Sequence, residues 1–488
     1  MRLGLQHTYA ALPDRFFARV APTPVPDPKL VVLNGGLARA LGLDPQSLEP
    51  EAAAMLSGNR IPEDAEPIAM AYAGHQFGGF VPSLGDGRAI LLGEIKGRDG
   101  ILRDVQLKGA GLTRFSRGGD GRAALGPMLR EYLISEAMHA LGVPTTRSLA
   151  VVTTGEQVFR ESALPGAVLT RVATSHVRVG TFQYFAARGD EDAVRTLLEY
   201  VIARHYPEAR DTEVPALSVL RSVAQRQAAL IADWMLLGFI HGVMNTDNMS
   251  VVGETIDYGP CAFMDEYDPN AVFSSIDQRG RYAFANQPAI AQWNLARLAE
   301  TLLPLINPET EQAIALATGV LEPFIGEFEA RFLAGMRRKI GLAQPREGDA
   351  DLVKRLLALM MQSHADFTLT FRRLALAAAM PAEETRLREL FVQTADIDSW
   401  LRDWRTFVTH DRQSLEQRLA GMRAASPAYI PRNHRVQSAL DAAEAGDYEP
   451  FRALLEVLQH PFDEGPEKSE YAGPPRPEER VLRTFCGT

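Results

Sequence analysis

Two short motifs near the middle of the chain carry side chains that can bind a metal ion beside a nucleotide. The first runs from His241 to Asn248 and reads His-Gly-Val-Met-Asn-Thr-Asp-Asn, and the second is Asp257-Tyr258-Gly259. The amide oxygen of Asn248 and the carboxylate of Asp257 are ligands that Mg²⁺ or Mn²⁺ accepts next to a triphosphate. These residues therefore predict the transfer of a group from a nucleotide.

The order of these residues is that of a protein-kinase catalytic segment with one part changed. A kinase has the pattern H-R-D-x-x-x-x-N followed by D-F-G, and the Asp of the first motif is its catalytic base. Here His241 and Asn248 keep that spacing and residues 257–259 replace D-F-G, but Val243 occupies the position of the base. The motifs predict a metal–nucleotide site that lacks the usual proton acceptor.

Asp247 is the carboxylate best placed to replace that proton acceptor. It lies beside the expected metal ligand Asn248, whereas Asp265 and Glu266 are weaker candidates further along the chain. A general base must lie within reach of the proton that it removes. We therefore expect Asp247 to accept the proton.

Two glycine-rich stretches precede these motifs and are candidates for phosphate binding. The first, residues 73–88, ends in Gly-Asp-Gly-Arg, and the second, residues 117–122, contains Asp120 and Gly121 before a predicted helix. Glycine lets backbone N–H groups approach phosphate oxygens because it has no Cβ. A plain hairpin turn at the first stretch and an Asp-capped helix start at the second would explain the same residues.

Three basic residues are further candidates for phosphate contacts. Lys108 ends a β-like run similar to the V-A-I-K strand of kinases, and a carboxylate on the following helix would hold it, with Glu131 favoured over Glu136. Arg171 and Arg178 follow the last predicted strand and can clamp phosphate oxygens. Solvated surface charges are the competing interpretation for all three, and a kinase needs no arginine pair at this point.

The composition is that of an ordinary globular protein of 488 residues, with 46% apolar and 23% charged residues. The net charge of −10 argues against binding to nucleic acid or to a membrane surface. Two cysteines are too few for a disulfide scaffold or a zinc site. The N-terminus lacks the apolar core of a signal peptide, so we expect a cytoplasmic location, and nothing in the sequence indicates the oligomeric state.

The expected secondary structure changes from strands to helices along the chain. Residues 1–70 read as an N-terminal extension, residues 71–185 as a β-rich lobe, residues 186–460 as a helical lobe, and residues 461–488 as an extended, mobile tail. This order predicts an α+β, protein-kinase-like fold of two lobes with an enlarged helical C-lobe. The predicted strands of the first lobe are 89–95, 104–108, 148–153, 157–161 and 167–172. Its single predicted helix is 125–141.

The helical lobe is predicted from apolar periodicity and holds the central motifs near its start. A short β-like run, 249–252, is expected between Asn248 and Asp257. The predicted helices are 191–206, 215–241, 288–305, 309–340, 350–379, 384–406, 411–422, 433–446 and 448–459.

Taken together, the motifs resemble the selenoprotein O family, whose members have a kinase fold. The resemblance covers nearly the whole length, and the C-terminal Cys486 is similar in place to the selenocysteine of some members. The matching sequences are Asn34-Gly35-Gly36-Leu37-Ala38, Gly74-His75-Gln76-Phe77-Gly78, Gly85-Asp86-Gly87-Arg88, Gln106-Leu107-Lys108-Gly109, Pro144-Thr145-Thr146-Arg147, Gly242-Val243-Met244-Asn245-Thr246-Asp247-Asn248 and Asp257-Tyr258-Gly259-Pro260.

The resemblance implies a protein nucleotidyltransferase that uses Mg²⁺ or Mn²⁺. Such an enzyme binds ATP turned round relative to kinases and transfers AMP to a Ser, Thr or Tyr hydroxyl of a protein, releasing pyrophosphate. UMP transfer from UTP is also implied. In this sequence Asp247 would be the catalytic base, and Asn248 and Asp257 would bind metal. The nucleotide-binding residues would be Gly85, Gly87, Arg88, Lys108, Asp120, Gly121, Arg171, Arg178 and Asp257.

Two other functions and one regulatory hypothesis are compatible with the sequence. A small-molecule kinase of the aminoglycoside-kinase type is disfavoured by Val243, and a non-catalytic pseudokinase is disfavoured by the intact Lys108, Asn248 and Asp257. Cys261 follows the second motif directly. A disulfide to Cys486 would tie the tail over the active site, whereas two reduced thiols are the usual cytosolic state.

Overall fold

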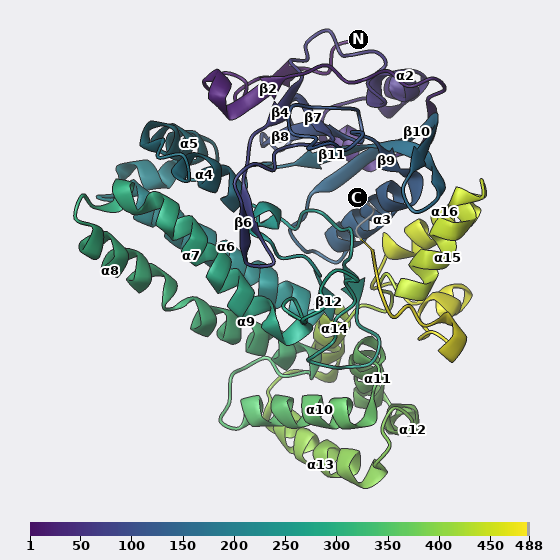
Figure 1. The fold of residues 1–488 in the computed structure, drawn as a ribbon. Helices are drawn as coiled ribbons and strands as arrows, with labels where there is room; N and C mark the ends of the chain where they lie inside the picture. The colour runs from purple at the N-terminus through teal and green to yellow at the C-terminus, as the bar shows by residue number, and fades with distance from the viewer. Residues whose placement is uncertain (486–488) are drawn as a thin grey trace.

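The computed structural model describes residues 1–485 and shows an α+β protein, with an antiparallel sheet in the N-terminal part and helices in most of the rest. Figure 1 shows the sheet above and the helical region below. The strand order is β2-β4-β7-β8-β11-β10-β3, with β1 on β7 and β9 on β11. The strands are β1 Leu5–Gln6, β2 Phe17–Arg19, β3 Lys29–Leu33, β4 Ile68–Met70, β7 Ala89–Lys96, β8 Leu102–Lys108, β9 Ala123–Ala124, β10 Arg147–Phe159 and β11 Ala163–Ala173.

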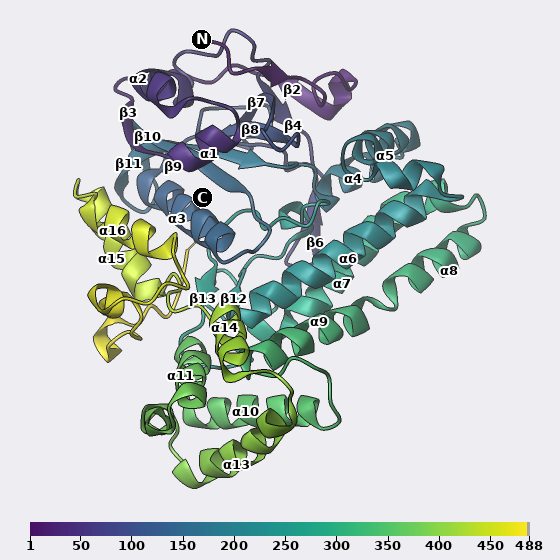
Figure 2. The same ribbon diagram turned by 180° about the vertical axis from the view of Figure 1, so that it is seen from behind.

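The two faces of the sheet pack against different helices because successive strand residues point to opposite sides. Val151 and Leu169 join the core that contains helix α3, whereas Val152 and Val168 join the core beneath α1 and α2. Figure 2 shows α3 on one side of the sheet and α2 on the other. The first helices are α1 Gly35–Ala40, α2 Pro45–Leu56, α3 Leu125–Ala140 and α4 Val179–Ala186.

The helical region continues the core that contains α3, and α15 and α16 lie beside α3 (Figure 1). Its helices are α5 Glu191–His205, α6 Pro215–Leu236, α7 Gln287–Ile306, α8 Thr310–Leu321, α9 Phe324–Lys339, α10 Asp349–Ser363, α11 Phe367–Ala379, α12 Glu384–Arg388, α13 Thr394–His410, α14 Leu415–Ala425, α15 Asn433–Glu444 and α16 Glu449–Leu458. Four short strands complete the site region: β5 Gly74–Gln76 pairs with β6 Gly79–Val81, and β12 Phe239–Ile240 pairs with β13 Ala262–Phe263.

The predicted helices differ from the observed ones mainly at breaks. Predicted helix 309–340 is two helices that meet at Pro323, because proline lacks the N–H that would continue the first. Predicted helix 350–379 is also two helices. The first, α10, ends at His364, whose φ of 51° is left-handed. The second, α11, is capped by Asp366, whose carboxylate accepts from Leu369 N at 2.8 Å. Residues 384–406 likewise contain α12 and the start of α13.

Further differences lie close to the two central motifs. Helix α6 ends at Leu236 rather than 241, since Gly238 has a φ of 71° and stops the helix. The β-like run 249–252 is wrong as a strand: within it only Ser250 forms an isolated bridge, with Arg178. Helix α4 was not predicted. The predicted strands 148–153 and 157–161 belong to one strand, β10. The pairing register of β10 with β11 shifts between Thr153 and Gln157, around Gly155.

Both ends of the chain are joined more closely to the body than the sequence indicates. Residues 1–70 supply strands β1 to β4 to the main sheet. In residues 461–485, which the sequence predicts as an extended tail, Thr484 forms a bridge with Ser274 and its Oγ1 donates to the carbonyl of Pro260 at 2.6 Å. These contacts join segments far apart in sequence, which local patterns cannot reveal.

Candidate active site

A cleft of about 490 Å³ lies between the sheet, α3 and the loop that follows β12. Each candidate residue from the sequence lines it. These residues are Gly85, Gly87, Arg88, Lys108, Asp120, Gly121, Arg171, Arg178, Asp247, Asn248 and Asp257. The structure therefore brings together side chains that are spread over more than a third of the sequence, and their roles can be judged from their contacts.

Lys108, at the end of β8, makes two ion pairs that cross the cleft. Its Nζ lies 2.5 Å from Glu131 Oε2 on α3 and 2.9 Å from Asp257 Oδ1. The predicted pairing with Glu131 is confirmed. Glu136, the other candidate, instead binds Arg147 at 2.6 Å. The ammonium of Lys108 is thus fixed beside the Asp of the second motif.

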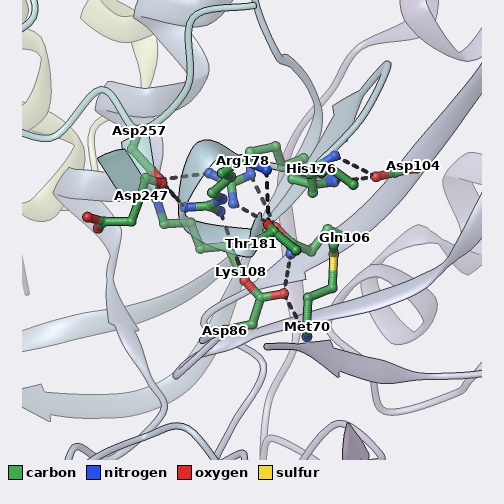
Figure 3. A network of polar contacts seen from close by, with 12 residues as sticks. Met70, Asp86, Asp104, Gln106, Lys108, His176, Arg178, Thr181, Asp247 and Asp257 are labelled. Atoms are coloured by element: carbon green, nitrogen blue, oxygen red, sulfur yellow. Dashed lines mark hydrogen bonds and ion pairs between the residues drawn. The ribbon is translucent and has the colours of Figure 1, made fainter. Parts of the chain in front are cut away.

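Arg171 and Arg178 are buried side chains rather than surface charges. Arg171, on β11, contacts Asp257 Oδ1 at 2.7 Å and Glu131 Oε1 at 3.2 Å. Arg178, just before α4, contacts Asp257 Oδ2 at 3.2 Å and donates to the carbonyl of Asp247 at 2.8 Å. Figure 3 shows Arg178 between the Asp257 carboxylate and the strand residues. The arginine pair converges on one carboxylate.

Asp257 is held in an unusual backbone conformation and in a strongly positive environment. Its φ of 64° is left-handed, which is uncommon for a residue with a Cβ and frequent at functional positions. Burial alone would raise its pKa, but Lys108, Arg171 and Arg178 outweigh burial and hold the pKa of Asp257 well below its ordinary value. The carboxylate is therefore ionised at neutral pH.

Asp247 has the opposite electrostatic environment, although it lies in the same cleft. Its carboxylate is buried, Gln76 Nε2 approaches Oδ2 only at 3.4 Å, and Oδ1 has no hydrogen-bond partner among residues 1–485. In Figure 3 this carboxylate points away from the arginine network. Burial raises the pKa of Asp247 to about 6, and Arg178 offsets this only in part. A base with these properties is ionised at pH 7 yet accepts a proton readily.

Glycine is required at two turns that shape the cleft. Gly85 has a φ of 67°, and a Cβ there would lie 2.3 Å from the Phe115 ring. Gly121 has a φ of 71°, and its Cβ would lie 2.2 Å from the carbonyl carbon of Gly111. Neither turn leaves room for a side chain. The glycine-rich stretches are thus tightly packed turns on the cleft wall, and their phosphate contacts stay a prediction.

Asp120 and its neighbours bring further arginines to the cleft. Asp120 accepts from Arg122 N at 2.9 Å and pairs with Arg160 NH1 at 2.8 Å, so it caps the turn before α3 and orients Arg160. Arg117, Arg122 and Arg160 all line the cleft. Sequence reasoning missed Arg160 because it lies at the turn between β10 and β11 with no motif around it. Its relation to Asp120 exists only in the fold.

Asp86 and Tyr72 are two other cleft residues that the sequence did not single out. Asp86 is buried and accepts from Gln106 Nε2 at 3.0 Å and Met70 N at 3.1 Å, and it lies 3.9 Å from Arg178 (Figure 3). The Arg178 guanidinium stacks on Tyr72 at 4.5 Å from the ring centre. Both orient Arg178. The position of Asp86 between Gly85 and Gly87 was the only sequence signal for either residue.

The residues present fit a divalent cation held jointly with a nucleotide. The Asn248 amide donates to the carbonyl of Val243 at 3.0 Å, an arrangement that leaves its oxygen available as a ligand. Asp257 supplies an ionised carboxylate that lines the same cleft. One carboxylate, one amide oxygen and phosphate oxygens form the kind of donor set that Mg²⁺ accepts.

Comparison with known proteins decides the family. The model of the family described as "Protein adenylyltransferase SelO" matches residues 1–459. The chain belongs to the SelO family of protein adenylyltransferases. Relatives named "Protein nucleotidyltransferase YdiU" are 60% identical over 483 residues in Rhizobium meliloti strain 1021 and 61% identical over 484 residues in Rhodopseudomonas palustris strain BisB5. These alignments cover 99% of this chain and 99% and 98% of the relatives.

Membership of the SelO family makes the chain an enzyme of the nucleotidyltransferase class, with ATP as co-substrate and proteins as acceptors. The resemblance to the selenoprotein O family is thereby confirmed. Within residues 1–485, no helix is both long and apolar enough to cross a membrane. The way in which this SelO-family member acts on ATP is inferred from the residues that line its cleft.

We expect Cys261 to react slowly with thiol reagents in the folded protein. Its side chain is fully buried, and burial raises the pKa of the thiol to about 11, so little reactive thiolate exists at neutral pH. Alkylation at pH 7.5 followed by peptide mass mapping should label Cys261 only after unfolding. Labelling at the rate of a free thiol would contradict this. The disulfide to Cys486 stays a prediction, since Cys486 lies outside the described residues.

Proposed function

We propose that this enzyme transfers AMP from ATP to a Ser, Thr or Tyr hydroxyl of another protein and that UTP can serve as donor of UMP. The observation that carries the proposal is the buried Asp247 carboxylate with a free oxygen and a pKa raised to about 6. It lies in the same cleft as Lys108, Arg171 and Arg178. Attack of a hydroxyl on a phosphate group requires a proton acceptor and nearby fixed cations that stabilise the developing negative charge.

In the proposed reaction Asp247 removes the proton of the acceptor hydroxyl. The hydroxyl oxygen forms a bond to the α-phosphorus, and the bond from that phosphorus to the oxygen bridging to the β-phosphate breaks. Pyrophosphate leaves with the bonding electrons, and the proton stays on Asp247. Asn248 and Asp257 would hold Mg²⁺ or Mn²⁺, which supplies positive charge to phosphate oxygens when bound.

The cations of the cleft would stabilise the charge that moves to pyrophosphate. Lys108, Arg171 and Arg178 are held in place by carboxylates before the nucleotide arrives, so they need little rearrangement during the reaction. A nucleotide turned round relative to kinases would present its α-phosphate to Asp247 and its β- and γ-phosphates to the turns at Gly85 and Gly121. Arg88, Arg117, Arg122 and Arg160 line the same cleft.

We also infer that residues 71–185, which supply α3 and strands β7 to β11 of the sheet, and residues 186–460, which form the helical region, are the two lobes of a protein-kinase-like fold. The Lys108–Glu131 pair and the order of Asn248 and Asp257 support this. The side chain at the position of the kinase base is Val243, which lines the cleft and cannot accept a proton. This favours AMP transfer over phosphoryl transfer. The test is which phosphate of ATP reaches the acceptor protein.

A further inference from the structure

Several large apolar side chains are exposed at the mouth of the cleft. Phe77, Phe80 and Ile276 are 37%, 40% and 50% exposed, and Phe77 and Ile276 line the cleft that contains Asp247. Large apolar side chains gathered at one place on a surface are a common sign of a contact with a partner. Because they lie at the opening where the acceptor hydroxyl must enter, they are candidates for contacts with the acceptor.

The hairpin formed by β5 and β6 is fixed to the loop that carries Asp247. His75 N donates to Thr246 Oγ1 at 2.7 Å, and Phe77 N donates to Asn245 Oδ1 at 3.0 Å. Tyr282 OH donates to the same Asn245 oxygen at 2.6 Å, and the Phe77 ring packs on Tyr282 with ring centres 5.1 Å apart. A partner bound on the hairpin would therefore be held at a fixed position relative to Asp247.

The same region carries the positive charge of two arginines, Arg279 and Arg281. The Arg281 guanidinium stacks on Trp293 of α7 at 4.9 Å, and Arg279 is exposed. Neither arginine has a carboxylate within ion-pair distance among residues 1–485, and Arg281 Nε is buried without a hydrogen-bond partner. The nearby carboxylate of Asp277 is buried and accepts from the backbone N–H groups of Arg281 and Tyr282 at 3.0 and 2.7 Å.

The other described residues around Trp293 add no carboxylate that pairs with Arg279 or Arg281. Arg297 also stacks on Trp293, but it pairs with Glu300 at 2.5 Å. His75 packs against Trp293 and Phe80, and burial lowers the pKa of His75, so it is neutral at pH 7. In a chain with a net charge of −10, Arg279 and Arg281 form a local basic site beside apolar side chains.

We propose that Phe77, Phe80, Ile276, Arg279 and Arg281, here called the acceptor platform, bind an extended segment of the protein substrate that carries a carboxylate and a bulky apolar residue near the target hydroxyl. This rests on the proposed function, since the target hydroxyl is the one that Asp247 deprotonates. Opposite charges select and orient partners across an interface, and aromatic and arginine side chains supply much of the binding energy at interfaces. The platform thus selects the hydroxyl that receives AMP.

The experiment measures transfer of α-labelled ATP to pools of synthetic peptides with a central Ser, Thr or Tyr. One pool is acidic, one basic and one neutral, each with or without a neighbouring leucine. The variants are Ile276→Asp and Arg281→Glu. Matched controls are Ile314→Asp, at an isoleucine 46% exposed on α8, and Arg221→Glu, at an exposed arginine on α6. ATP binding by each variant is measured in parallel.

We expect the unsubstituted protein to label the acidic, leucine-containing pool best. Ile276→Asp should lower that labelling roughly tenfold, and Arg281→Glu should shift the preference to the basic pool, with ATP binding unchanged in Arg281→Glu and both controls active. A shift of preference cannot result from misfolding.

Equal behaviour of the variants and their controls would overturn the proposal. Labelling of intact proteins but of no peptide pool would also overturn it, because recognition would then need a folded partner. No transfer of α-label to any protein by the unsubstituted enzyme would instead contradict the proposed function itself.

Discussion

Replacing Asp247 with asparagine is expected to reduce AMP transfer severely and, at pH 8, to make the folded protein more stable. The loss of activity follows from removal of the proton acceptor and should be about 10²- to 10⁴-fold, the range for general bases. ATP binding should persist, because the Asp247 carbonyl that accepts from Arg178 is unchanged. Initial rates of α-label transfer, together with ATP binding, measure both effects.

The gain in stability follows from the same buried carboxylate. Its pKa is 3.8 in a model compound and about 6 in the fold, so the folded state favours the protonated form. This contribution to stability is present below about pH 4 and is lost as the pH rises through about 6, which corresponds to about 3 kcal/mol. Asparagine avoids that loss, so the difference in unfolding free energy between the variant and the parent should grow from pH 4 to pH 7.

Asp233 on α6 provides a matched control for this prediction. Burial raises its pKa to about 6 as well, but it does not line the cleft. Asp233→Asn should change the pH dependence of stability in the same direction and leave transfer intact. The activity of the parent enzyme should rise with pH through about 6 as Asp247 ionises. If Asp247→Asn kept full activity, Asp247 would not be the base.

Replacing Asp257 with asparagine is expected to have the second largest effect. The change removes the negative charge shared by Lys108, Arg171 and Arg178 and the carboxylate that would bind metal. We expect transfer to fall about 10²- to 10³-fold and the concentration of Mg²⁺ or Mn²⁺ needed for half-maximal activity to rise. Transfer measured across a metal titration tests this.

The same variant should lose stability without nucleotide and recover part of it with ATP. Removing one partner of a buried ion pair costs about 3 kcal/mol, because the cations stay without their counter-charge. The phosphates of ATP then replace that charge, so ATP should raise the unfolding temperature more in the variant than in the parent. Asp349→Asn breaks a buried pair with Arg337 outside the cleft and should lower stability without this ATP effect. An unchanged metal requirement in Asp257→Asn would rule out Asp257 as a ligand.

The sequence predicted those parts of the site whose residues stand in short motifs. His241 to Asn248 and residues 257–259 needed only correct spacing, and Lys108 with Glu131 needed only a strand followed by a helix. The strands and α3 that carry them follow from apolar alternation and from the glycine and proline after residue 141. These features depend on residues that are close together in the sequence, so a single sequence is enough to predict them.

The parts that the sequence did not predict depend on contacts between distant segments. Apolar periodicity continues through the break at Pro323 because the helices on both sides bury similar faces. The pairing of Thr484 with Ser274 and of Arg160 with Asp120 has no local signal. The opposite pKa shifts of Asp247 and Asp257 also arise only in the fold, from which cations face each carboxylate.

AMP transfer and phosphoryl transfer are distinguished by ATP labelled at either the α- or the γ-phosphate, incubated with the enzyme, an acceptor protein, and Mg²⁺ or Mn²⁺. We expect label from the α-phosphate to appear on the acceptor, label from the γ-phosphate to leave in pyrophosphate, and Asp247→Asn to transfer neither. Label on the acceptor from the γ-phosphate alone would contradict AMP transfer and indicate a kinase.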